Sequence, residues 1–407
     1  MPYPESRRRP APIGVGRRPS ETATTSQRWW QLHSDTMHPL LPASRAVAPV
    51  LRAHADANEE ARRLVPAVIT ALQEADFFRM CVPAVYGGPE VDPVTYLSVI
   101  EELAAADAAS GWCANISSTT ASMSWFLEEA WAREIFGTNR ASGGAFAPTG
   151  KGTAVAGGWR VSGKWAWGSG TQHSAWITAG TMCDNGEFHL MFAPRGEVTD
   201  LDTWFSLGLR GTGSTDFALN DVFVPDGRSV QPLKGKAVPT CALAHFPNFG
   251  MLAAGVASTT LGIARRAIEE LVTLATEKTP LFARSKLAEH PPAQLAVARA
   301  ESLLSSARAF LTDEVAKAWE TTQTGTRVEV AQRARIRLAC AHAAEVTTEA
   351  VDLCHRSGGG TAVYTSSPLQ RCVRDIHTAS AHLMVSDRNT LTYAKLAFGL
   401  DADVSML

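Results

Sequence analysis

The periodicity of apolar residues changes twice along the chain, and this order limits the folds that it can adopt. From Pro42 to Glu129, and again from about Phe246 onward, apolar residues recur every three or four positions, which predicts helices. Between these blocks, from Ala141 to Pro225, short alternating runs are separated by turn residues, which predicts an antiparallel sandwich or barrel. The sequence therefore predicts a mainly α protein with a central β domain.

Four long helices are expected in the last block, and glycines break the third from the fourth. They are Phe249–Thr276, Pro292–Thr321, Val328–His355 and Pro368–Leu396. Helices of this length with short links favour an antiparallel four-helix bundle. The expected domains are a disordered leader (1–40), an N-terminal helical domain (41–140), the β domain (141–240) and the bundle (241–407). The leader is rich in Arg, Pro, Ser and Thr, and Met37 is an alternative start.

Composition excludes several classes of protein. Lys and Arg total 38 against 40 Asp and Glu, so the net charge of -2 argues against a nucleic-acid binder. The seven cysteines are scattered without a C-x-x-C pair, which is typical of reduced intracellular thiols. No apolar run is long enough to span a bilayer. We therefore expect a cytoplasmic protein with no membrane or nucleic-acid partner.

Several segments resemble the acyl-CoA dehydrogenase superfamily, and they occur in the order of that fold. Val161–Gly170 resembles its flavin-facing strand, and Gly208–Pro225 resembles its last β-domain strands. Gly358–Gly360, with Ser367–Asp375 after it, resembles the turn into its final helix. The resemblance covers residues 41–400 and implies an acyl-CoA dehydrogenase-like fold.

The resemblance also indicates which branch of the superfamily the chain joins. A dehydrogenase of this fold needs a carboxylate base, which most members carry in the last helix after an Arg-Asp pair. Leu383 stands at that position. The less common location of the base is early in the first bundle helix, and the segment Cys241–Ile268 there contains no Asp or Glu. The chain is therefore more similar to two-component (group D) flavin-dependent monooxygenases. Their oxygenase components include 4-hydroxyphenylacetate hydroxylase, a steroid-phenol hydroxylase and dibenzothiophene monooxygenase.

This resemblance implies catalytic roles for Ser169 and His382. Ser169 matches a serine that contacts the flavin near N5, where a hydroxyl can accept from N5–H and shelter a C4a-hydroperoxide. His382 matches a histidine beside C4a, which can take a phenol proton or donate to the peroxide. The alternative interpretations are a turn serine and a packed histidine on the last helix.

Further residues are expected around these two. Those assigned to flavin binding are Trp167, Gly168, Gly170, Arg284, Gly359 and Gly360, with Arg284 on the phosphate across a subunit interface. Those assigned to substrate binding are Trp112, His173 and His377. A solvated loop arginine, a helix stop and core tryptophans are the structural alternatives. His377 competes with His382, and their five-residue spacing speaks against a metal pair, so no metal site is expected.

The expected function is the oxygenase component of a two-component monooxygenase. It would use reduced FMN or FAD and O2 to hydroxylate an aromatic or phenolic small molecule, or to oxidise a nitrogen or sulfur atom. No nicotinamide-binding fingerprint is visible, so a separate flavin reductase is implied as partner. The family assembles as dimers of dimers, so a homotetramer is expected. The alternatives are an acyl-CoA dehydrogenase with a relocated base, such as Glu90 or Asp387, and a non-catalytic binding or assembly protein.

Overall fold

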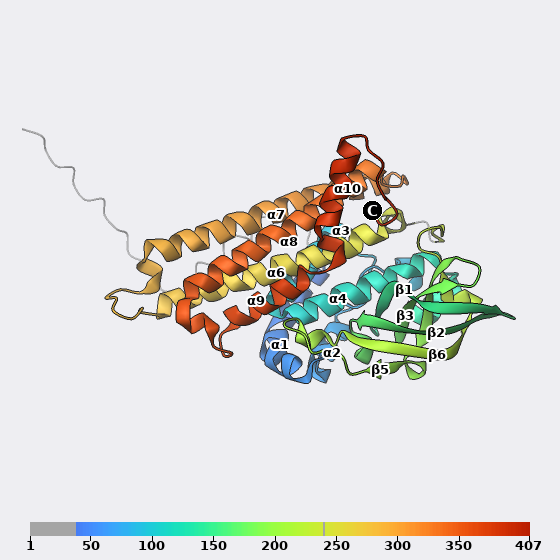
Figure 1. The fold of residues 1–407 in the computed structure, drawn as a ribbon, viewed down its shortest axis with the longest axis horizontal. Coiled ribbons are helices and arrows are strands. Elements are labelled where there is room, and N and C mark those ends of the chain that lie inside the picture. Colours follow the sequence, from blue (N-terminus) through green and yellow to red (C-terminus); the bar gives the residue numbers. More distant parts are fainter. Residues whose placement is uncertain (1–37, 239–240) are drawn as a thin grey trace, which may run out of the picture. The chain divides into compact units, whose positions relative to one another are not determined.

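The computed structural model describes residues 38–238 and 241–407. The first 37 positions of the expected leader, with the alternative start at Met37, lie outside the described residues. Residues 38–407 belong to one compact unit, in which helices, then strands, then helices follow one another along the chain (Figure 1). This order confirms the predicted mainly α fold with a central β domain.

The N-terminal helices are held by specific caps. They are α1 (Leu40–Ala61), α2 (Pro66–Glu74), α3 (Pro93–Ala106), α4 (Ala108–Ala121) and α5 (Glu129–Phe136). Pro93 fills the first position of α3, and Asp92 accepts from the backbone N–H groups of its first turn. Asp107 separates α3 from α4 and accepts from Ser110 N, so it starts the second helix as the first ends. The position of α4 matters because this helix carries Trp112.

The strands form a single seven-stranded sheet in the order β5-β6-β2-β1-β3-β4-β7. They are β1 (Ser142–Val155), β2 (Gly158–Gly168), β3 (Trp176–Cys183), β4 (Phe188–Pro194), β5 (Thr199–Leu201), β6 (Thr215–Pro225) and β7 (Ser229–Val230). Neighbours are antiparallel except β1 and β3, which are parallel. The turn after Gly168 reverses the chain, and β3 then pairs with the far edge of β1, so it runs in the direction of β1.

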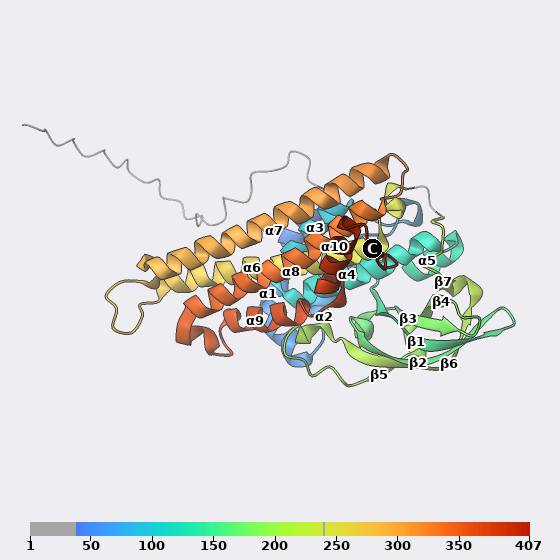
Figure 2. The ribbon, with the colours of Figure 1, turned by 45° about the horizontal axis from the view of Figure 1, so that its top comes forward.

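Three long helices of the C-terminal block lie side by side in both ribbon views (Figures 1 and 2). They are α6 (Asn248–Glu277), α7 (Pro291–Gln323) and α8 (Val330–Gly358). The expected fourth helix, Pro368–Leu396, is instead broken into α9 (Pro368–Ala379), a short 3-10 turn (Leu383–Val385) and α10 (Asp387–Ala397).

Arg337 stabilises the break in the fourth helix through hydrogen bonds to the residues around it. This side chain of α8 is buried, and its guanidinium donates to Met384 O at 3.2 Å and to Asn389 Oδ1. A buried arginine needs such acceptors, and the carbonyl that it takes here lies between α9 and α10. His382 was expected on a continuous helix; that placement is wrong, because the residue lies in the break.

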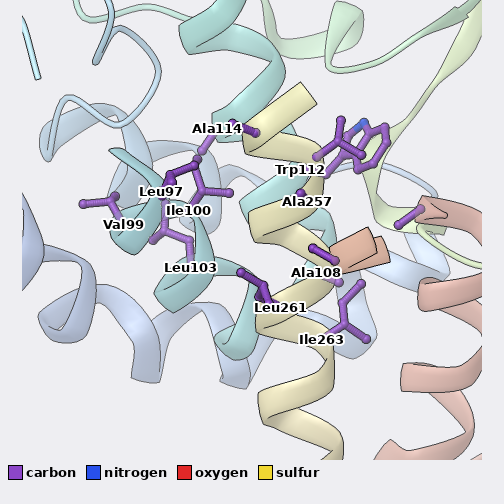
Figure 3. Close-up of a cluster of buried hydrophobic side chains, with 14 of the residues drawn as sticks. Leu97, Val99, Ile100, Leu103, Ala108, Trp112, Ala114, Ala257, Leu261 and Ile263 are labelled. Carbon is purple, nitrogen blue, oxygen red and sulfur yellow. The ribbon is translucent and has the colours of Figure 1, made fainter. Parts of the chain in front are cut away.

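The core beside the sheet is formed where α3, α4 and α6 pack together. Its side chains include Leu103, Leu261 and Ile263, and Trp112 lies among them (Figure 3). The same helix α4 also packs against β1, so it joins the apolar core to the sheet. Within residues 38–238 and 241–407, no helix combines the length and the apolar character that crossing a membrane requires.

Candidate active site

Three residues from distant parts of the chain meet between α4, the end of β2 and the break after α9. Trp112 Nε1 donates to Ser169 Oγ at 3.0 Å. The ring of Trp112 also meets the His382 ring edge to face, with 5.5 Å between centroids and 76° between planes. Trp112 and Ser169 are both buried, and His382 is half-buried. The structure thus brings together both expected catalytic residues, with Trp112 between them.

Ser169 lies where the backbone leaves β2 through a turn of glycines. Gly170 has a φ of 71°, in the left-handed region that favours glycine, and it starts the turn that carries His173. Gly143 of β1 runs so close that an added Cβ would lie 2.6 Å from Ser169 O. The backbone is therefore fixed on both sides of Ser169, which leaves its hydroxyl little freedom of position.

The hydroxyl of Ser169 begins a row of buried hydroxyl groups. Its Oγ lies 2.7 Å from Ser214 Oγ, which lies 2.6 Å from Thr212 Oγ1. Thr212 Oγ1 donates to Leu209 O at 2.8 Å. In turn, Leu209 N donates to Asp375 Oδ1 at 2.6 Å, and Asp375 belongs to α9. The hydrogen bonds therefore tie the loop before β6 to the helix that leads to His382.

Trp167 presents a large aromatic surface two residues before Ser169. Its side chain is 73% exposed, whereas Trp165 on the same strand is fully buried. Its φ of 60° is rare for a residue with a side chain, and it falls where the pairing of β2 with β6 shifts register, between Trp165 and Gly168. An exposed indole held in a costly backbone conformation is a feature to expect at a binding site.

His382 is neutral at physiological pH and has a defined tautomer. Burial, with a further contribution from the positive charge of Arg337, lowers the pKa of His382 to about 4. Its Nδ1 accepts from Met384 N at 3.3 Å. The single proton of the neutral ring is therefore on Nε2, which can donate a hydrogen bond to a ligand.

His173 lies beside the same turn. Its ring packs against Phe78 with 5.6 Å between centroids, and an added Cβ on Gly170 would lie 3.3 Å from it. Burial lowers the pKa of His173 to about 4, so this imidazole is also neutral near pH 7. The placement next to Gly170 brings His173 to the edge of the candidate site.

Other expected site residues lie apart from this group. His377 is exposed on α9, with its Nε2 3.1 Å from Asp352 Oδ1. Arg284 is exposed in the connection between α6 and α7. Gly359, with a φ of 59°, ends α8, and Gly360 has open space around it. In the part of the chain that the structure describes, none of these forms a hydrogen bond or ring contact with Trp112, Ser169 or His382.

Carboxylates that could replace a dehydrogenase base are engaged elsewhere or exposed. Glu90 accepts from Ala84 N at 2.6 Å, and Asp387 is exposed in the first turn of α10. Asp375 is buried but binds Leu209 N. Across residues 38–238 and 241–407, no cluster of three or more His, Cys, Asp or Glu could hold a metal ion. The arrangement can hold a planar ligand against Trp167 and Ser169, with neutral imidazoles nearby.

Three residues of this site were not anticipated from the sequence. Thr212 and Ser214 belong to the glycine-rich stretch Gly208–Asp216, in which hydroxyl residues are only a weak sign of a functional site. Their relation to the site is visible only in the structure, where Ser214 Oγ lies beside Ser169 Oγ. Arg337 is hidden in the pattern of α8, and its acceptors are backbone carbonyls and an amide rather than an acid. Nothing in the local sequence marks it as a buried charge.

Comparisons with known proteins show the family to which the chain belongs. Residues 42–130 match the family of the acyl-CoA dehydrogenase N-terminal domain, and residues 254–387 match that of the C-terminal domain. Indole-3-acetate monooxygenase of Pseudomonas putida is 30% identical over 367 residues, or 88% of this chain and 94% of that protein. The flavin-dependent monooxygenase oxygenase subunit HsaA of Rhodococcus jostii (strain RHA1) is 30% identical over 383 residues, which cover 89% of this chain and 99% of that protein.

A solved structure extends the similarity to the fold. The crystal structure of 3-HSA hydroxylase from Rhodococcus sp. RHA1 superposes with a TM-score of 0.85 at 29% identity, covering 91% of this chain and 99% of that one. The chain thus matches nearly the whole length of these relatives, and the two curated proteins named above are monooxygenases. It belongs to the flavin-dependent monooxygenases built on the acyl-CoA dehydrogenase fold.

Proposed function

We propose that the chain is the oxygenase component of a two-component monooxygenase that uses reduced FMN or FAD and O2 to hydroxylate an aromatic small molecule. The observation that carries this proposal is the buried hydroxyl of Ser169, held by Trp112 beside the exposed indole of Trp167. Bound reduced flavin supplies the activation of O2 at its C4a atom.

The residues at the end of β2 fit an isoalloxazine ring. A flat ligand can cover the exposed face of Trp167, which accounts for an aromatic side chain that otherwise meets water. Gly168 packs closely against Phe217, and Gly170 takes a φ of 71°, so both glycines fix the turn that presents Trp167 and Ser169. Ser169 would then serve as the acceptor for the N5–H of a reduced flavin.

The phosphate end of the flavin requires other groups. Arg284, Gly359 and Gly360 are exposed and make no contact with the Ser169 group in the described residues. We propose that they serve the flavin of a neighbouring copy in a homotetramer, where a guanidinium and free backbone amides suit a phosphate. The expected domains 41–140, 141–240 and 241–407 would then each contribute to one composite site.

The imidazoles and Trp112 are proposed to face the substrate. Neutral His382 can donate a hydrogen bond from Nε2 to a substrate oxygen. Trp112 and His173 supply apolar and aromatic surface at the same place. His377 is exposed and paired with Asp352, so we assign it a role outside this contact surface.

The partner and the substrate class follow from the relatives. HsaA is an oxygenase subunit by name, and the other relative acts on indole-3-acetate. We therefore propose a separate flavin reductase as partner and a phenol or an indole as substrate, with oxidation of nitrogen or sulfur as the wider class. The dehydrogenase alternative is not favoured, because Leu383 takes the base position and Glu90 and Asp387 are directed to other contacts or to solvent.

The proposal is tested by supplying reduced flavin and O2 and measuring where the oxygen goes. Purified protein, a flavin reductase and a nicotinamide donor are mixed with a panel of phenols, indoles and sulfur heterocycles. Hydroxylated product and hydrogen peroxide are quantified per flavin oxidised. Product that depends on the protein and falls in Ser169→Ala, with more peroxide, supports the proposal. Peroxide alone with every substrate, together with bleaching of oxidised flavin by an acyl-CoA thioester under nitrogen, would overturn it.

A further inference from the structure

The row of hydroxyl groups behind Ser169 has a defined direction. Thr212 Oγ1, Ser214 Oγ and Ser169 Oγ are linked at 2.6 Å and 2.7 Å, and all three residues are buried. Each hydroxyl has one proton to donate and two lone pairs to accept with. The partners of these hydroxyl groups within the protein are one another and the groups at the two ends of the row, Leu209 O and Trp112 Nε1.

The first end is the carbonyl oxygen of Leu209, which can only accept. Thr212 Oγ1 lies 2.8 Å from it, which is a hydrogen bond only if the Thr212 proton points to that oxygen. If the proton pointed to Ser214, two acceptor oxygens would face each other at 2.8 Å with no proton between them. The proton of Thr212 is therefore committed to Leu209 O.

This commitment sets the remaining protons. Since Thr212 has no second proton, Ser214 must donate to Thr212, and Ser169 must then donate to Ser214. At the other end Trp112 Nε1, which can only donate, gives its proton to Ser169. Ser169 is left with one free lone pair and no free proton.

We infer that Thr212 and Ser214 are positioning residues that make Ser169 an acceptor only, so that the site discriminates between the redox states of its flavin. Reduced flavin has a proton on N5 and can donate to the free lone pair, whereas oxidised flavin has a bare N5 that needs a donor. A bare nitrogen facing the Ser169 lone pair is unfavourable, so oxidised flavin is bound more weakly. This inference rests on the proposed function and extends it to the basis of cofactor exchange.

The test compares the dissociation constants of oxidised and reduced FMN, measured anaerobically by equilibrium titration without O2 or substrate. Wild type is expected to bind the reduced form more tightly. In Thr212→Val, Ser214 loses its acceptor and can donate its proton to Ser169 instead. Ser169 then no longer donates to Ser214 and can donate to the bare N5 of oxidised flavin. The dissociation constant of oxidised FMN divided by that of reduced FMN should then fall about tenfold. For a two-electron couple this lowers the midpoint potential of bound flavin by about 30 mV. Ser214→Ala removes the acceptor of Ser169 directly and should have the same effect.

Two matched variants separate the proton direction from general damage. Thr212→Ser keeps the hydroxyl and should keep the wild-type ratio. Ser174→Ala removes a buried hydroxyl in the turn after Ser169 that lies outside the row and donates to Gly170 O at 2.9 Å. This variant should also keep the wild-type ratio. Thermal unfolding of each variant reports any change in stability independently of the ratio.

The outcomes distinguish this inference from the proposed function. If Thr212→Val and Ser214→Ala keep the wild-type ratio while wild type prefers reduced flavin, the directed row is overturned and the proposed function stands. If Thr212→Ser lowers the ratio as much as Thr212→Val, packing rather than proton direction is responsible, and the inference is again overturned. If wild type binds neither form of FMN or FAD, the proposed function itself fails.

Discussion

Trp112 and Ser169 are joined by a 3.0 Å hydrogen bond that connects a helix of the N-terminal block to the end of a sheet strand. Trp112 can only donate, so the bond fixes one lone pair of the Ser169 hydroxyl. The same indole also meets the ring of His382 edge to face. One side chain thus sets the distance between the two residues to which we assign the chemistry.

Trp112→Phe should separate the hydrogen bond from the ring contact. Phenylalanine keeps an aromatic ring against His382 but cannot donate to Ser169, so the free energy of unfolding should fall by about 1 kcal/mol. Ser169 Oγ loses one of the two hydrogen bonds that position it, so reduced flavin should bind several-fold more weakly. Chemical denaturation and anaerobic titration measure the two effects. Trp125→Phe is the control, since it removes a buried bond to Cys81 O, at 2.9 Å, away from the site; it should lower stability only.

His382→Ala and His377→Ala should differ sharply. His382 contacts Trp112, whereas His377 is exposed beside Asp352. Loss of an acid or base group costs about a hundredfold or more in the chemical step, so product per flavin oxidised should collapse in His382→Ala while peroxide rises. His377→Ala should stay within about twofold of wild type, since an exposed pair contributes little. The reverse order would place the substrate on the α9 face that carries His377.

The helical and β blocks could be predicted because periodicity is local, but two features of the fold depend on distant residues. The break that contains His382 is stabilised by Arg337, nearly fifty positions earlier, and no local stop signal accompanies it. The parallel pairing of β1 with β3 arises from the strand order, which alternation does not encode. Family resemblance supplied Ser169 and His382 as residues, but not the register of the segment that carries His382.

The supporting residues of the site were beyond sequence reasoning for a similar reason. Ser214 matters only because its Oγ lies 2.7 Å from that of Ser169, forty-five positions away. Trp167 was expected near the flavin, yet its exposure follows from a register shift between β2 and β6 that side-chain alternation cannot reveal. Ring stacking, proton direction and backbone strain are properties of contacts between segments.

Trp167→Gly should improve stability while weakening cofactor binding. Glycine adopts a φ of 60° without the penalty of about 1 kcal/mol or more that a side chain incurs, so the midpoint of thermal unfolding should rise. The planar ligand loses its aromatic platform, and flavin affinity should fall about tenfold. Phe223→Ala, an exposed aromatic elsewhere on the sheet, should leave flavin affinity unchanged. Equal losses in both variants would argue against a specific platform.

His173 and His382, whose pKa values are both lowered, should make the protein sensitive to acid. The pKa values of His173 and His382 are about 4 in the folded state against an ordinary value of 6.5, so the unfolded chain binds more protons between these limits. The free energy of unfolding should therefore fall as the pH drops from about 6.5 to about 4. Above about pH 6.5, protonation of these two histidines should have no effect on it. His173→Gln should reduce the slope of unfolding free energy against pH by up to about 1.4 kcal/mol per pH unit. An unchanged slope would mean that the ring is solvated.

Asp375→Asn should change the pH profile in the opposite direction. Burial raises the pKa of Asp375 from 3.8 to about 7, and the nearby Asp107 adds to this, while the bond from Leu209 N opposes it. The folded state therefore binds the extra proton between about pH 4 and pH 7, and this contribution to stability is lost as pH rises through that window. Asparagine can still accept from Leu209 N but carries no titrating proton.

The variant's stability relative to wild type should therefore increase from about pH 4 to about pH 7, by up to about 1.4 kcal/mol per pH unit, and stay constant at higher pH. Urea denaturation at several pH values across this window measures the difference. Because Leu209 keeps its partner, the preference for reduced over oxidised flavin should not change, which separates the carboxyl group from the hydroxyl row behind Ser169. A stability difference that is the same at every pH would show that Asp375 stays ionised in the fold.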